Sequence, residues 1–206
     1  MDKKEKEVRC IATELRATGD DGRTIEGKAV VFNSWSEPMW RSIESIDPNA
    51  FDNCDMSDVI LNVNHDDTVI LGRTISGTLK LEVRSDGLYF VAEAPNTTDG
   101  NDTLELLRRG DLRHCSFAFT VAEEKWREAT PDNGMKYHQR TITAIDRLFD
   151  VSVVVHPAYT ETEATARSLE KRRLEFCNPE PIDPDKTEVE ERERRNREYQ
   201  YLHIIS

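Results

Sequence analysis

Apolar and polar residues alternate over several short stretches of this chain, which is the pattern of half-buried strands. The clearest stretch, LKLEV at residues 79–83, ends a strand that we predict at residues 75–83. A second strand is predicted at residues 88–94, and the Asp86-Gly87 pair between the two is typical of a hairpin turn. The two stretches therefore predict a β-hairpin with one buried and one exposed face.

Further strands are predicted from short, largely apolar runs. They cover residues 8–15, 24–32, 59–63, 115–121, 136–148 and 149–155. We expect the first two of these to pair as a hairpin around the turn GDDG at residues 19–22. An irregular loop is expected at residues 33–49, followed by a short helical turn near residues 50–53.

A change of periodicity predicts a helix at residues 102–110, DTLELLRRG. Its first turn is acidic, its last turn holds Arg108 and Arg109, and Gly110 suits the left-handed position that ends a helix. Roughly six to eight short strands with few helices favour a closed or nearly closed β-barrel over a layered α/β fold.

The bulk properties exclude several kinds of partner. The chain has 206 residues and a net charge of −12, and its acidity argues against nucleic acid, which is bound through clustered Lys and Arg. No apolar run approaches the roughly 20 residues that a membrane helix needs, so we expect no membrane partner. Residues 1–7 lack the apolar stretch of a secretory signal, and we therefore expect the protein in a cytoplasm.

The cysteines and histidines give no metal-binding spacing. The four cysteines are far apart and form no CxxC pair; they are Cys10, Cys54, Cys115 and Cys177. The acidic pair Asp66-Asp67 beside His65 lacks the HxH or HxxxH spacing of a metal site. We expect no metal, no cofactor and, in a reducing compartment, no disulfide.

Two residues are candidates for the nucleophile and the base of a hydrolytic site. His65 lies just past the end of an apolar strand, in NHDD, and Ser116 begins another strand after the Gly110 stop. Amide hydrolysis needs a nucleophile, a base, a group that orients the base, and donors for the oxyanion. From the residues alone the commoner interpretation of Ser116 is a hydroxyl bonded to a neighbouring backbone group. Cys115 is a rival nucleophile, but strand neighbours point to opposite faces, so only one of the two can meet His65.

Several segments, taken in order, resemble the sequence blocks of the caudovirus prohead protease family. They are GKAVVF at residues 27–32, IDPNAF at 46–51, NHD to LGR at 64–73, DGL at 86–88, LRRG with CSFAF at 107–119, and DVSVV to PA at 150–158. Asn49 and Ala118 stand where the family pattern has glycine. The resemblance covers roughly residues 24–164.

This family is similar in fold to herpesvirus assemblin, a Ser-His protease on a small β-barrel with flanking helices. The resemblance therefore implies a mainly β, α+β fold built as a small closed or nearly closed barrel of the herpesvirus-protease type. It makes Ser116 the nucleophile and His65 the general base. The third member stays open between Asp150, which falls on the acidic position of the last block, and His156, because assemblin-type sites use a second histidine.

The resemblance also implies what the protein does. We expect a serine endopeptidase of phage prohead maturation that cleaves scaffold segments, the delta segment of the major capsid protein precursor, and itself, through an acyl-enzyme. It would act inside the assembling prohead, in the host cytoplasm, with self-association as a further option. The alternatives are a non-catalytic scaffold or assembly factor on the same barrel, and a host-encoded peptidase of prophage origin.

Two further assignments complete the expectations. We place the oxyanion hole at backbone N–H groups near residues 108–114, and regard the loop with Trp35 and Trp40 as a substrate wall or a cover of the core. We divide the chain into a protease domain at residues 7–167 and a charged C-terminal tail at residues 168–206, partly helical or disordered.

Overall fold

The computed structural model describes residues 5–12, 15–19, 22–38, 42–129, 137–155 and 173. The elements of this part of the chain are, in order, β1 (Glu7–Ala12), β2 (Arg16–Thr18), β3 (Thr24–Val31), β4 (Ser42–Ile46), a 3₁₀ turn η1 (Pro48–Phe51), β5 (Ile60–Val63), β6 (Asp66–Arg73), β7 (Leu79–Arg84), β8 (Gly87–Glu93), α1 (Thr98–Arg109), β9 (His114–Ala129) and β10 (Tyr137–Val154).

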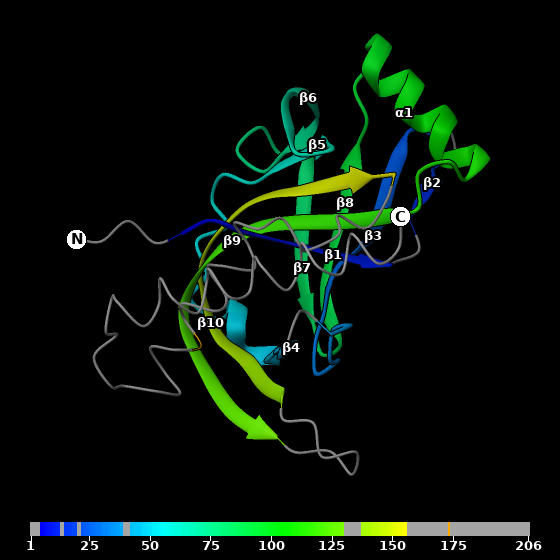
Figure 1. Ribbon diagram of the computed structural model, residues 1–206. Helices are drawn as coiled ribbons and strands as arrows, with labels where there is room; N and C mark the ends of the chain where they lie inside the picture. Colours follow the sequence, from blue (N-terminus) through cyan, green and yellow to red (C-terminus); the bar gives the residue numbers. More distant parts are fainter. Residues whose placement is uncertain are drawn as a thin grey trace, which may run out of the picture.

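The strands form two sheets (Figure 1). The larger sheet has the order β1-β9-β10-β5-β6, with β4 also paired to β10, and the smaller sheet has the order β2-β3-β8-β7. The long strands β9 and β10 are antiparallel neighbours. On its other edge β10 pairs in parallel with β4 near its start and with β5 near its end. Strand β10 therefore connects distant parts of the chain within one sheet.

The mainly β fold is confirmed, and α1 is the one α-helix element of the described residues. The predicted closed barrel is not found among the described residues, because their hydrogen-bonded strands form two separate sheets. One core nevertheless lies between them. It contains fully buried side chains from both sheets, including Phe90 and Leu88 of the smaller and Phe117 and Phe119 of the larger.

The hairpin predicted around residues 86 and 87 is confirmed by the pairing of β7 with β8. The hairpin predicted between residues 8–15 and 24–32 is wrong. Strand β1 pairs with β9, and the edge of β3 that it would have used is taken by the short strand β2. A nearby segment that pairs locally closes a shorter loop, which lowers the entropy lost on pairing.

Other element boundaries also differ from the prediction. Strand β4 lies inside the stretch expected to be irregular, and β10 is one continuous strand where two were expected. The helix begins earlier than predicted, at Thr98, because the Thr97 side chain caps it by accepting a bond from the Gly100 N–H. Its end is as predicted, with Gly110 in the left-handed conformation at a φ of 78°.

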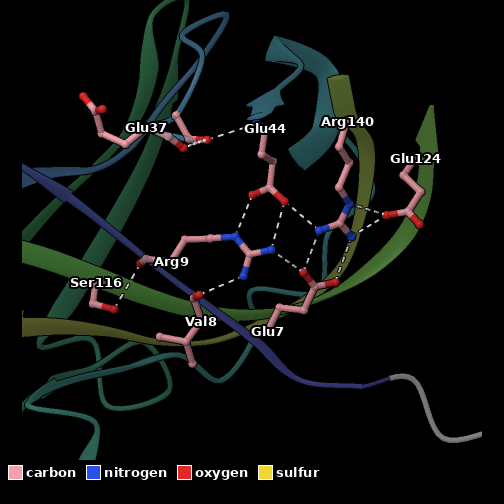
Figure 2. A network of polar contacts seen from close by, with 9 residues as sticks. Glu7, Val8, Arg9, Glu37, Glu44, Ser116, Glu124 and Arg140 are labelled. Atoms are coloured by element: carbon pink, nitrogen blue, oxygen red, sulfur yellow. Dashed lines mark hydrogen bonds and ion pairs between the residues drawn. The ribbon is translucent and has the colours of Figure 1, made fainter. Parts of the chain in front are cut away.

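A buried ion cluster of five charged side chains ties β1 to three other strands (Figure 2). Its members are Glu7 and Arg9 of β1, Glu44 of β4, Glu124 of β9 and Arg140 of β10. The Arg9 guanidinium contacts Glu44 at 2.7 Å and Glu7 at 2.6 Å, and Arg140 contacts the same two carboxylates at 2.6 Å and 2.7 Å.

Arg140 is fully buried, and both arginines of the ion cluster stay charged. Burial by itself would lower the pKa of Arg9 and of Arg140, but the carboxylates of Glu44 and Glu7 outweigh it and raise each pKa above its ordinary value. The N-terminal strand is therefore fixed to the larger sheet by charge as well as by its ladder.

Candidate catalytic site

One row of cross-strand neighbours on the larger sheet is polar. Cys10 lies opposite Ser116, Ser116 opposite Ser152, and Ser152 opposite Asn62. Ser116, Ser152 and Asn62 are fully buried. Because alternate residues of a strand point to opposite faces, Cys115 projects to the other face, where it belongs to the hydrophobic core. The row marks the face on which the site lies.

His65 reaches this face from the tight turn between β5 and β6. Asn64 and His65 are the two turn residues, with φ of 53° and 58°, and Val63 pairs with Asp66 across the turn. Two-residue hairpins favour turns with positive φ at both positions, which usually take Asn and Gly. The His65 N–H donates to Ser152 Oγ at 2.8 Å, so the turn is anchored to β10. Asp66 is the first residue of β6.

Asp150 is turned onto the same face by a β-bulge. Leu148 pairs with Phe119 and Asp150 pairs with the adjacent Ala118, so Phe149 is an extra residue in β10. Leu148 is buried in the core, and strict alternation would send Asp150 to the core face as well. The bulge shifts the alternation by one residue, as bulges next to functional sites often do. Asp150 consequently lies on the face of Ser116, and only 2% of it is exposed.

These three side chains form a continuous chain of contacts. His65 Nδ1 lies 2.6 Å from Asp150 Oδ1, and His65 Nε2 lies 2.6 Å from Ser116 Oγ. A neutral imidazole that donates from Nδ1 to the carboxylate has an acceptor at Nε2 for the serine hydroxyl. This arrangement can remove a proton from Ser116 while the carboxylate holds the ring in orientation.

The rival nucleophile Cys115 lies in an unreactive place. Its side chain is fully buried among apolar residues, and this burial raises the pKa of the Cys115 thiol well above its usual value. A thiol must become a thiolate to attack, so the raised pKa and the opposite orientation both argue against it.

The amides expected to form the oxyanion hole are engaged elsewhere. The Gly110 N–H donates to Leu107 O, and the Asp111 and Leu112 N–H groups donate to Leu106 O. These bonds complete the end of α1. The expectation for residues 108–114 is therefore not supported at these three positions.

Other expected site residues have different outcomes. His156, the alternative third member, lies outside the described residues, as do Trp40 and Cys177. Trp35 is 45% exposed. Within the part of the chain that the structure describes, no group of three or more His, Cys, Asp or Glu side chains could hold a metal ion.

Sequence reasoning missed two residues that contact the site, Ser152 and Lys6. Lys6 Nζ lies 3.2 Å from Asp150 Oδ2. Ser152 had a usable signal, because its spacing of two from Asp150 on one strand puts both side chains on one face. Lys6 had none, since it stands in the uniformly charged run KKEKE at residues 3–7.

A serine, a histidine and a carboxylate hydrogen-bonded in series on a mainly β scaffold are typical of a serine peptidase. The model of the family described as "Caudovirus prohead serine protease" matches residues 11–175, and the chain belongs to this family. It is accordingly a serine peptidase, a hydrolase, of a family that acts in prohead maturation. No curated protein and no solved structure matches the chain. No helix among the described residues is long and apolar enough to cross a membrane.

Proposed function

We propose that the protein is an endopeptidase of prohead maturation in which Ser116 is the nucleophile, His65 the general base and Asp150 the third member. The observation that supports these roles is the pair of contacts that joins Asp150 to His65 and His65 to Ser116, each of 2.6 Å. Both contacts are within the reach that proton transfer requires.

In the proposed reaction Ser116 Oγ attacks the scissile carbonyl carbon while its proton moves to His65 Nε2. The tetrahedral intermediate collapses as His65 gives that proton to the leaving amine, which departs and leaves an ester on Ser116. Water then attacks the ester, His65 takes its proton, and Ser116 Oγ leaves with that proton to regenerate the enzyme. Asp150 stays ionised throughout and stabilises the imidazolium.

The Ser116 hydroxyl has two acceptors within reach and one proton to donate. It lies 3.0 Å from the main-chain oxygen of Arg9 and 2.6 Å from His65 Nε2. The proton must be directed to His65 for attack. The contact with His65 Nε2 is the shorter of the two, which favours donation of the hydroxyl proton to His65.

The proposed substrates are proteins of the assembling prohead. Membership of the family supports action on capsid or scaffold proteins. We assign the delta segment of the major capsid protein precursor, the scaffold segments and the protease itself as targets, with residues 168–206 as the candidate segment for self-cleavage. This tail would follow a catalytic domain at residues 7–167, and the reaction would take place inside the prohead.

We also propose that the two sheets together correspond to a nearly closed barrel of the herpesvirus-protease type. The support is the single core that both sheets share. Sheets that bury one common core behave as one structural unit whether or not their edges are joined.

The test compares wild type with Ser116→Ala on the purified capsid protein precursor, followed by gel and intact mass. Cys115→Ala is the matched control, because it changes the neighbouring residue on the opposite face. We expect wild type and Cys115→Ala to trim the precursor and Ser116→Ala to lose at least a thousandfold in rate, roughly the scale for removing a catalytic serine. The assignment would be contradicted if Ser116→Ala trimmed the precursor at the wild-type rate. It would also be contradicted if Cys115→Ala lost trimming while Ser116→Ala kept it.

A further inference from the structure

We propose that Lys6 is a positioning residue of this peptidase that acts through Asp150. The inference rests on the proposed function, because it requires Asp150 to serve as the partner of His65. It gives the N-terminal segment a part in the reaction, beyond its place at the edge of the larger sheet.

The two oxygens of the Asp150 carboxylate have different partners. Oδ1 lies 2.6 Å from His65 Nδ1, and Oδ2 lies 3.2 Å from Lys6 Nζ. The carboxylate is 2% exposed, whereas 47% of the lysine side chain is exposed. A buried carboxylate that has a donor at each of its oxygens is held in one orientation. Lys6 supplies a charged donor to the oxygen that His65 does not use.

The ammonium group of Lys6 is held from a second side. It lies over the ring of Phe149, 5.1 Å from the ring centroid, and an aromatic face attracts a cation at this distance. Phe149 is the extra residue of the bulge that turns Asp150 toward Ser116. The bulge therefore orients the carboxylate and also provides the ring against which its lysine partner packs.

The strand that follows Lys6 is firmly placed. Glu7 and Arg9 of β1 belong to the buried ion cluster, so the backbone next to Lys6 cannot shift without separating buried charges (Figure 2). The main-chain oxygen of Arg9 also lies 3.0 Å from Ser116 Oγ, as the second acceptor within reach of that hydroxyl. The N-terminal segment thus contacts both ends of the proposed triad, Asp150 through Lys6 and Ser116 through Arg9.

A lysine in this place has a specific consequence for catalysis. When His65 takes the serine proton, Asp150 must hold the imidazolium in place, and a carboxylate fixed at both oxygens does this better than one fixed at a single oxygen. Lys6 touches the carboxylate and not the peptide being cut. Its loss should therefore lower kcat and leave KM unchanged.

The experiment measures kcat and KM for cleavage of the purified capsid protein precursor, with the melting temperature of each variant. The variants are Lys6→Met, Lys6→Arg, Asp150→Asn and the double variant Lys6→Met with Asp150→Asn. Lys28→Met is the matched control, because Lys28 forms a lysine–aspartate pair with Asp86 on the smaller sheet.

We expect Lys6→Met to lower kcat roughly tenfold, the scale of one charge-assisted hydrogen bond, at unchanged KM and melting temperature. Lys6→Arg should regain most of this loss, and Lys28→Met should lose nothing. In the Asp150→Asn background Lys6→Met should have no further effect, since the group through which it acts is gone.

Each contrary result identifies which idea fails. If Asp150→Asn is impaired and Lys6→Met is not, the role of Lys6 is wrong and the proposed triad stands. The inference is also overturned if Lys6→Met lowers kcat further in the Asp150→Asn background. The same holds if a lower melting temperature of Lys6→Met accounts for its loss of kcat. If Asp150→Asn keeps the full kcat, Asp150 is not the third member of the triad, and this part of the proposed function is wrong.

Discussion

His65 occupies a left-handed backbone conformation that non-glycine residues seldom adopt, with Asn64 before it in the same conformation. The two residues form the turn that carries the imidazole over the sheet. Glycine would fit the second position more easily, and His65 places there the imidazole proposed as the general base. The residue of the proposed proton transfer is thus one of the three non-glycine residues of the described chain with positive φ, beside Asn33 and Asn64.

This conformation leads to a prediction at Asn64. Asn64→Gly should fold and cleave normally, because glycine adopts positive φ freely. Asn64→Val should lower the free energy of unfolding by about 1–2 kcal/mol, since a β-branched side chain clashes in the left-handed region. Urea unfolding and precursor cleavage would measure both effects. Equal stability and activity of the glycine and valine variants would show that the turn does not constrain His65.

Much of the residue-level site could be named from the sequence. The resemblance nominated Ser116 and His65, with Asp150 or His156 as the third member. The structure brings Ser116, His65 and Asp150 into contact, while their roles remain proposals. Ser152 was missed although its spacing of two from Asp150 was a usable signal, whereas Lys6 had no signal in the sequence. Each contacts a residue that is distant in sequence, His65 for Ser152 and Asp150 for Lys6.

At the level of elements, local signals were more dependable than long-range pairing. The Asp86-Gly87 turn and the Gly110 helix end depend on nearby residues, and both are confirmed. The partner of β1 depends on packing against β9, more than a hundred residues away, and the predicted hairpin is wrong. Alternation within a strand shows which residues share a face, but not which strand lies alongside.

The bulge at Phe149 is the element-level feature with the largest effect on the site. An uninterrupted strand would place Asp150 on the same face as Leu148, within the core. Nothing in the run DRLFDVSVV at residues 146–154 indicates where the alternation shifts. The shift becomes visible only in the register between β9 and β10.

On the scale of the whole molecule, the buried ion cluster joins β1, β4, β9 and β10 at one point (Figure 2). Each arginine of the cluster contacts buried carboxylates and balances their charge. The sequence does not predict this cluster, because its members come from four separate strands.

The cluster leads to a prediction about stability. Arg140→Met should lower the free energy of unfolding by about 3 kcal/mol or more, because it removes a buried guanidinium that contacts the carboxylates of Glu7, Glu44 and Glu124. Arg84→Met, which breaks an exposed pair with Glu82, is the control and should leave the unfolding midpoint unchanged. Chemical denaturation measures both. A small effect at Arg140, matching that at Arg84, would mean that the cluster does not hold the strands together.

The central claim is that Ser116 is the nucleophile and that His65 activates it. The most direct measurement treats the folded protein with a fluorophosphonate and maps the adduct by peptide mass spectrometry. The account predicts a single adduct on Ser116 in wild type, and labelling slowed at least a hundredfold in His65→Gln, the scale for losing a general base. An adduct on another residue, or labelling of Ser116 at the same rate without His65, would contradict it.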